Sequence, residues 1–413
     1  MEAHLDPSQF GNQQQISIQH YLVQMLHRIL GILDTKNRKE TNAVLVNLID
    51  WDNAFPRQCP KLGIQSFLKN GVRPSIIPVL ISFFQDRTMS VRWHEKCSVP
   101  RDVNGGGPQG ATLGLLEYVC QSNDCADCVP VADRFRFVDD LSILEVINLL
   151  NVGLASHNVK QQVPSNIPDH NMFIPSEHLK SQKYLDQINE WTINHKMKIN
   201  EKKSENMIFN FSRKFPFSAS LTLNGQEIET VEKARLLGTV ISNDLKWDEN
   251  ISEIVKKANR RMVLLRKVAA FNPKVEDLKI IYILFIRSIL EQSSVVWHSS
   301  ISDENSDDLE RIQKSAVKVI LGQRYMGYRK SLEFLGIQTL KERRKELCLK
   351  FAQKCLSNPK LRGMFPENRK AHQMKTRDPE RFIIEKARTE RFKRSPLNYM
   401  RMLLNKENRK KKI

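Results

Sequence analysis

The chain lacks any long apolar run, since none approaches the roughly 20 residues needed to span a bilayer. Its first residues also lack the basic and then apolar pattern of a secretory signal peptide. Cysteine is scarce, with 7 in 413 residues, and the odd number is typical of a reducing compartment. We therefore expect an intracellular protein of the nucleus, the cytoplasm or both, with no membrane as partner.

Three of the few cysteines lie close together in the sequence. Cys120, Cys125 and Cys128 resemble part of a zinc site. A structural zinc site needs four ligands, and the nearest further candidates, Cys97 and His157, are distant in sequence. Ordinary reduced thiols are therefore the favoured interpretation.

Positive charge is what the chain has in excess. The formal net charge is +19 and the pI is about 9.6. The segment 361–413 holds 17 Lys/Arg against 6 Asp/Glu, so more than half of the excess lies there. Such a balance suits a polyanion, either nucleic acid or an anionic membrane surface. Without a membrane-spanning segment or signal peptide, nucleic acid is the better interpretation.

Hydrophobic periodicity predicts strands and short helices in the first part of the chain and mainly helices after 251. The predicted helices are 15–35, short segments within 61–86, 113–119, 179–197, 275–290 and 308–321; the predicted strands are 44–49, 89–93, 207–211 and 221–223. A polar, proline-bearing surface loop is expected over 153–178.

Two acidic sites follow or adjoin apolar segments. Asp139 and Asp140 stand side by side in an apolar setting, and an apolar strand over 44–49 leads directly into Asp50. Adjacent carboxylates repel each other and burial disfavours their ionisation, so a divalent cation is the natural compensation. Two strands that are far apart in the sequence and adjoin aspartates can be neighbours in one sheet. We therefore predict that a sheet brings these aspartates together into one metal site.

A glycine-rich loop lies between the two acidic sites in the sequence. Gly107-Pro108-Gln109-Gly110 precedes a helical run. Taken singly, an Asp-Asp pair is usually a solvated turn and such a loop is usually only a loop. The order of strand with Asp50, glycine loop and Asp139-Asp140 makes a functional interpretation preferable.

This ordered set resembles the palm of reverse transcriptases, most closely the non-LTR, jockey-like retrotransposon type. The resemblance runs from about Gln9 to Arg344. The segments that carry it are Asp50 with Ala54-Phe55, the loop 107–114, the turn 137–140, Asn200 with Lys203-Ser204, and Leu237-Gly238, which resembles a primer grip.

The resemblance implies an RNA-directed DNA polymerase that joins a dNTP to the 3′-hydroxyl of a DNA primer on an RNA template. Two Mg²⁺ ions, or Mn²⁺, would be held by Asp50 and Asp139 with Asp140 in support, because these hard cations prefer carboxylate oxygens. The residues expected to bind nucleotide or template are Phe55, Gly107, Pro108, Gln109, Gly110 and Lys203.

The expected fold is α/β: an antiparallel palm sheet with helices, followed by a helical thumb. We expect a palm with a remnant of the fingers over 1–245, a thumb over 246–345 and a basic helical extension over 346–413. The fingers should precede Gln9, so the chain is expected to be truncated at its N-terminus. The alternatives are a non-catalytic relic that binds nucleic acid and an RNA-directed RNA polymerase, which fits Phe55 less well.

Overall fold

A computed structural model describes residues 5–34, 41–108, 110–150, 172–368 and 381–411. The chain divides into two compact units, described separately here. Unit 1 comprises Met1–Tyr21 and Arg38–Glu232, and unit 2 comprises Leu22–Asn37 and Lys233–Ile413. In the described part of the chain, no helix is both long and apolar enough to cross a membrane.

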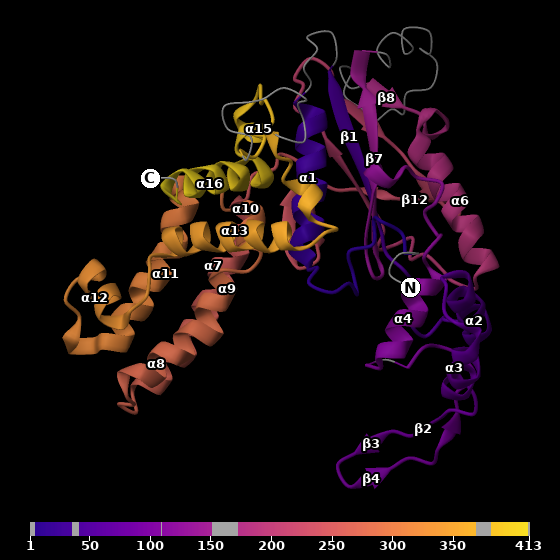
Figure 1. Cartoon of the computed structure of the whole chain (residues 1–413), viewed down its shortest axis with the longest axis horizontal. Helices are drawn as coiled ribbons and strands as arrows, with labels where there is room; N and C mark the ends of the chain where they lie inside the picture. The colour runs from indigo at the N-terminus through magenta and orange to yellow at the C-terminus, as the bar shows by residue number, and fades with distance from the viewer. Residues whose placement is uncertain (1–4, 35–40, 109, 151–171, 369–380, 412–413) are drawn as a thin grey trace. The chain divides into compact units, whose positions relative to one another are not determined.

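Unit 1 is built on a five-stranded sheet with the order β13-β9-β1-β7-β6 (Figure 1). The strands are β1 (Asn42–Ile49), β6 (Arg134–Phe137), β7 (Asp140–Asn148), β9 (Glu205–Phe209) and β13 (Glu229–Thr230). The pairs of β1 with β7 and β9, and of β6 with β7, are antiparallel. The edge strand β13 pairs with β9 in parallel, unlike these antiparallel pairs.

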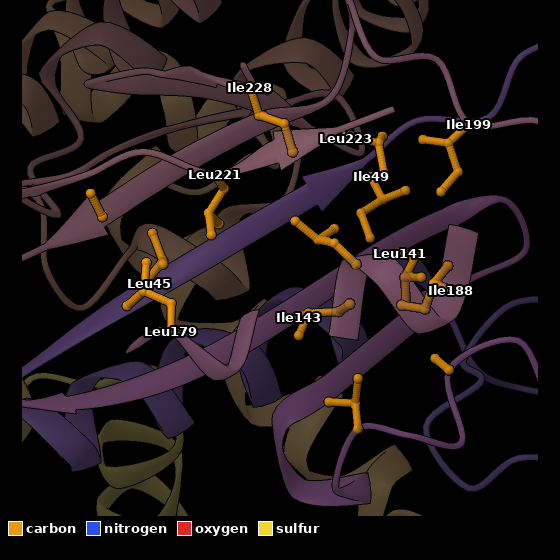
Figure 2. Packing of buried hydrophobic residues seen from close by; sticks show 14 of the residues in the cluster. Leu45, Ile49, Leu141, Ile143, Leu179, Ile188, Ile199, Leu221, Leu223 and Ile228 are labelled. Atoms are coloured by element: carbon orange, nitrogen blue, oxygen red, sulfur yellow. The ribbon is translucent and has the colours of Figure 1, made fainter. Parts of the chain in front are cut away.

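The central strand β1 is buried along most of its length, as its near-continuous apolar run predicts. Its residues join a core that also includes Leu141 and Ile143 of β7. The helix α6 (Lys180–Asn194) adds Leu185 and Ile188 to the same core, which Figure 2 shows from close by. The α/β class predicted from the sequence is confirmed.

The strand β6, which precedes the acidic turn, is not apolar as expected. Arg134 and Arg136 are both buried in it, and their guanidinium groups lie 3.1 and 3.4 Å from the carboxylate of Asp6. Arg136 also donates to the carbonyl oxygens of Ser122 and Asn123. This Asp6 network ties the N-terminal segment and the loop after α4 to β6, which leads into the turn at Asp139.

Three helices and a hairpin complete the region between the two acidic sites. The helices are α2 (Pro60–Lys69), α3 (Ile77–Phe84) and α4 (Thr112–Gln121), as expected. The strand predicted over 89–93 is instead broken into β2 (Thr88–Met89) and β3 (Arg92–Trp93). They pair with β5 (Arg101–Asp102) and β4 (Lys96–Cys97) in registers that differ by one residue, so the ladder is interrupted between them.

The expected surface loop over 153–178 lies largely outside the described residues, which resume at 172. Its end contains β8 (Met172–Ile174), which pairs in parallel with β10 (Phe217–Ala219). The strand expected over 221–223 is confirmed as β11 (Thr222–Leu223), paired with β12 (Gln226–Glu227).

The seven cysteines are free thiols. Burial raises the pKa of Cys120 to about 12 and that of Cys125 to about 11. Cys97 is exposed on β4, and His157 lies outside the described residues.

Unit 2 is mainly helical, with one short hairpin of β14 (Lys233–Leu236) and β15 (Thr239–Ser242). Its principal helices are most of α1 (Ile18–Leu33), α7 (Asp248–Ala269), α8 (Val275–Ile281), α11 (Asp303–Leu321), α12 (Tyr328–Leu335), α13 (Leu340–Ser357) and α16 (Pro396–Lys411). The helix predicted over 275–290 continues from α8 through a π-helical segment, Tyr282–Arg287, into α9 (Ser288–Leu290). Residues 369–380 of the expected basic extension lie outside the described chain.

We predict that Asp6→Ala lowers the free energy of unfolding by about 3–5 kcal/mol, because the buried Arg136 loses its carboxylate and Arg134 keeps only the exposed Asp127. Burial raises the pKa of Asp6, but hydrogen bonds from Ser8 and the charges of Arg136 and Arg134 outweigh it and leave the pKa below its ordinary 3.8. The stabilisation is therefore fully present above pH 3.8 and is lost as the pH falls through the lower folded pKa.

Urea denaturation at pH 7 and at a series of lower pH values measures both effects. Asp186→Ala, on an exposed position of α6, is the matched control and should change little. An unchanged midpoint for Asp6→Ala would contradict the role given to the Asp6 network.

Candidate active site

The register of the sheet brings the two acidic sites to the same edge. Ile49, the last residue of β1, lies opposite Leu141 in the antiparallel pair with β7. Asp50 directly follows Ile49 and Asp140 directly precedes Leu141. The two acids therefore lie at the same end of the β1–β7 pair. Ile49 and Leu141, which flank them, are labelled in Figure 2.

The carboxylates at this edge are electrostatically coupled. Burial raises the pKa of Asp140 to about 6, with further contributions from the charges of Asp139 and Asp50. Burial also raises the pKa of Asp50; the charge of Lys203 opposes this shift, while Asp139 and Asp52 add to it. Like charges therefore gather here, and each one disfavours the ionisation of its neighbours.

A later segment of the chain fastens the end of β1. The backbone N–H of Asn200 donates to the carbonyl of Asp50 at 2.8 Å, and the N–H of Asp50 donates to Oγ of Ser204 at 3.2 Å. Trp51 forms a bridge with Ile199. These bonds place Lys203, an exposed cation, near enough to Asp50 for its charge to oppose the rise in the pKa of Asp50.

The turn that carries Asp139 has an unusual backbone. Val138 has a φ of 59°, a left-handed conformation that a β-branched residue rarely adopts and that costs on the order of 1–3 kcal/mol. Its N–H donates to Oε1 of Gln9 at 3.0 Å, and the N–H of Gly11 donates to the same oxygen at 2.8 Å. A Cβ on Gly11 would lie 2.5 Å from the nitrogen of Val138, so only glycine fits behind the turn.

The glycine loop is held against the segment that follows Asp50. Gly107 donates from its N–H to the carbonyl of Phe55 at 2.9 Å, and the N–H of Gly106 donates to the carbonyl of Gln58 at the same distance. Gly106 has a φ of 74° and packs on Pro56, which leaves little room for a side chain.

Two side chains outside the predicted set support this loop. Arg87 donates from Nη2 to the carbonyl oxygens of Gly106 at 2.6 Å and Gly105 at 3.3 Å. The amide nitrogen of Gln58 donates to the carbonyl of Gly114 at the start of α4. The loop is therefore positioned by contacts from before and after it in the sequence. Gln109, one of its predicted binding residues, lies outside the described chain.

Phe55 is half-buried and its ring stacks on that of Tyr118 of α4, with centroids 5.2 Å apart. Tyr118 is itself fully buried, and burial raises its pKa well above the ordinary value, with smaller contributions from Cys125 and Asp139. The ring of Phe55 is therefore held in one place, on the same segment that binds the glycine loop.

The structure thus brings together, within unit 1, the three predicted acidic residues and Lys203, and it joins Phe55 to the glycine loop. Leu237 and Gly238 form the turn of the β14–β15 hairpin in unit 2. Five residues with no predicted role support the site: Gln9, Gly11, Gln58, Arg87 and Tyr118. Each acts through a contact with a distant part of the chain, for which the sequence carries no local pattern.

The donor set suits a hard divalent cation, since it consists of neighbouring carboxylates, and the pKa values of Asp50 and Asp140 are raised by burial and by nearby negative charge. In the part of the chain that the structure describes, no three His, Cys, Asp or Glu side chains are arranged to hold a metal ion. The carboxylates of Asp50, Asp139 and Asp140 are ligands that suit magnesium. In the structure their side chains are not arranged in a coordination geometry for the ion.

The sequence is similar to RNA-directed DNA polymerases of jockey-like non-LTR retrotransposons, which confirms the resemblance. It is 27% identical over 271 residues to the probable RNA-directed DNA polymerase from transposon BS of Drosophila melanogaster, covering 63% of this chain and 26% of that protein. For the polymerase from mobile element jockey of the same organism the identity is 24% over 247 residues, covering 60% and 24%. The chain spans about a quarter of the length of these relatives.

No protein-family model matches the sequence. Among solved structures, telomerase from Candida tropicalis in complex with a fragment of telomeric RNA matches with a TM-score of 0.37 and 14% identity, covering 83% of this chain and 51% of that chain.

We predict that Gly11→Ala destabilises the turn at Val138. The added Cβ would contact both the nitrogen and Cγ2 of Val138, at 2.5 and 2.6 Å, so backbone must move. We expect a loss of about 1–3 kcal/mol in the free energy of unfolding, as for other overpacked sites. Gly105→Ala is the matched control in the same unit, because a Cβ there meets nothing within 4 Å. Equal stability of the two variants in urea denaturation would refute this packing argument.

Proposed function

We propose that this chain carries the catalytic palm of an RNA-directed DNA polymerase, which extends a DNA primer on an RNA template. The observation that carries the proposal is the convergence of Asp50, Asp139 and Asp140 at one edge of the sheet. The similarity to retrotransposon polymerases supports it. The basic net charge of +19 suits polyanionic substrates.

In this proposal, Asp50 and Asp139 would hold two Mg²⁺ ions and Asp140 would support them. When bound, such ions activate the primer hydroxyl and neutralise the leaving pyrophosphate. The chain's own contribution is position: the β1–β7 register holds the acids together, and Gln9 and Gly11 hold the turn that presents Asp139. The mutual repulsion of the acids gives a bound cation a larger stabilising effect than a single carboxylate would.

The remaining residues bind and orient the substrates. Lys203, beside Asp50, is placed to interact with the triphosphate. The loop Gly107–Gly110 offers its backbone to the template and the incoming nucleotide. The ring of Phe55, fixed by Tyr118, would lie under the sugar and exclude a ribose 2′-hydroxyl.

A second candidate is a nucleic-acid-binding protein without polymerase activity. The observation that favours it is the lack, among the described residues, of a side-chain group arranged to hold a metal. Primer extension separates the two candidates. Template binding without extension in Mg²⁺ or Mn²⁺ would reject the polymerase proposal and support the second candidate.

We predict that Asp139→Asn lowers primer extension on an RNA template by at least about 100-fold, because a metal ligand is lost from a site that acts as a unit. The free energy of unfolding should stay equal or rise, because one of several mutually repelling charges is removed. Asp186→Asn on α6 is the control and should retain activity. Retained extension by Asp139→Asn would show that the catalytic acids are misassigned.

We predict that Phe55→Val raises the incorporation of ribonucleotides relative to deoxyribonucleotides by about tenfold or more, because the smaller side chain leaves room for a 2′-hydroxyl. Single-nucleotide extension with matched rNTP and dNTP pairs gives the ratio of kcat/KM values. Ile208→Val, at another partly buried position of the same core, controls for a general loss of packing. An unchanged ratio would remove Phe55 from sugar selection.

A further inference from the structure

The hairpin formed by β2 to β5 projects from unit 1 beyond α3 (Figure 1). Every residue from Thr88 to Asp102 is exposed, so the hairpin has no core of its own. A lone two-stranded hairpin is marginally stable in water at best. Its apolar side chains are nevertheless large, and their exposed fractions are 64% for Met89, 74% for Trp93 and 80% for Val99.

Basic side chains alternate with these apolar ones. Between Thr88 and Asp102 the hairpin carries Arg92, Lys96 and Arg101 against two acidic residues, Glu95 and Asp102. None of the three cations forms an ion pair with another described residue. Exposed apolar and cationic groups together suit a ligand that is both flat and anionic better than an apolar protein surface.

The tip of the hairpin shows this combination most clearly. Trp93 lies directly opposite Lys96 in the antiparallel pair, so the indole and the ammonium group share one face. The ring of His94 lies nearly perpendicular to that of Trp93, with centroids 5.1 Å apart, and Trp93 remains 74% exposed. A nucleotide carries an aromatic base and a phosphate, the two groups that this pair can bind.

The base of the hairpin is continuous with the glycine loop. β5 ends at Asp102, and Gly105 follows three residues later. At the other end of the hairpin, Arg87 precedes β2 and binds the carbonyl oxygens of Gly105 and Gly106. A strand bound by the hairpin is therefore held by the same segment that forms the loop.

We propose that the β2–β5 hairpin binds unpaired nucleic acid, with a base stacked on Trp93 and a phosphate contacted by Lys96 on the same face, while Arg92 and Arg101 add positive charge along the hairpin. The strand is unpaired because stacking on an exposed ring requires a free base face. The hairpin proposal rests on the proposed function in one respect: the bound strand is identified as the RNA template, at a point before it reaches the glycine loop. The stacking itself is independent of catalysis.

Tryptophan fluorescence of the full chain tests the proposal. Trp51, Trp247 and Trp297 are buried, so a base that stacks on Trp93 should quench the most exposed of the five indoles. Titration with an unpaired uridine RNA of about 12 nucleotides should quench wild-type emission. Trp93→Phe should abolish the quenching but retain affinity within about threefold, because a phenyl ring still stacks.

Affinity is measured in parallel by fluorescence anisotropy of labelled RNA. Trp93→Ala should bind about 5- to 100-fold more weakly. Ile193→Ala, which removes a side chain with a similar exposed fraction of 71% on α6, should bind as wild type. Lys96→Gln should reduce the slope of log K against log salt by about 0.7, whereas Lys183→Gln on α6 should leave it unchanged.

Two results would overturn the proposal. One is equal RNA affinity of wild type and Trp93→Ala. The other is a Trp93-dependent self-association of the chain without any effect on RNA binding, which would make the hairpin a protein interface. Primer extension keeps the two proposals distinguishable. If Trp93→Ala loses RNA affinity and the wild type does not extend a primer, the hairpin proposal holds and the polymerase proposal fails. If Trp93→Ala keeps its RNA affinity and the wild type extends a primer, the polymerase proposal holds and the hairpin proposal fails.

Discussion

The candidate site depends on the pairing of β1 with β7. This register places Ile49 opposite Leu141, and the acidic residues beyond them follow as a consequence. A slip of one residue would turn Leu141 and Ile143 from the core to the opposite face of the sheet. Since burial of each such side chain is worth about 1.5–3 kcal/mol, the core sets the register and holds the acids together against their repulsion. Burial raises the pKa of Asp140 to about 6, and repulsion from Asp139 and Asp50 adds to that shift.

The turn between β6 and β7 needs support of a different kind, because the sheet alone does not relieve the left-handed backbone of Val138. Gln9 satisfies the amide of Val138, and Gly11 leaves the space that the turn occupies. The N-terminal segment is in turn anchored through Asp6 to the buried arginines of β6. The strained turn thus belongs to a continuous set of polar contacts, and its conformation depends on residues more than a hundred positions away.

Much of this arrangement was predictable from the sequence, and what was not has a physical reason. The strand before Asp50, the helices α4 and α6, and the meeting of Asp50 with Asp139 follow from local apolar patterns and from the order of the acidic and glycine-rich segments. The roles of Gln9 and Arg87 were not predictable, because a side chain that binds a distant backbone group produces no periodicity. The buried arginines of β6 were missed for a related reason: arginine indicates exposure unless its partner, here Asp6, is known.

The acids and the glycine loop differ in how firmly they are held. The acids sit at the end of a central strand pair, where displacement requires the core to rearrange. The loop is instead held by a few bonds to carbonyl oxygens, from Arg87 and from the amides of Gly106 and Gly107, each with a net worth of about 0.5–1.5 kcal/mol. A ligand that contributes a few kcal/mol of binding free energy could therefore move the glycine loop, whereas it could not move the strand ends that carry Asp50 and Asp140. In the proposed function, a substrate that meets the loop would therefore displace the loop more easily than the backbone that carries the acids. Because Arg87 stands at the base of the β2–β5 hairpin, a strand bound there would act on the loop first.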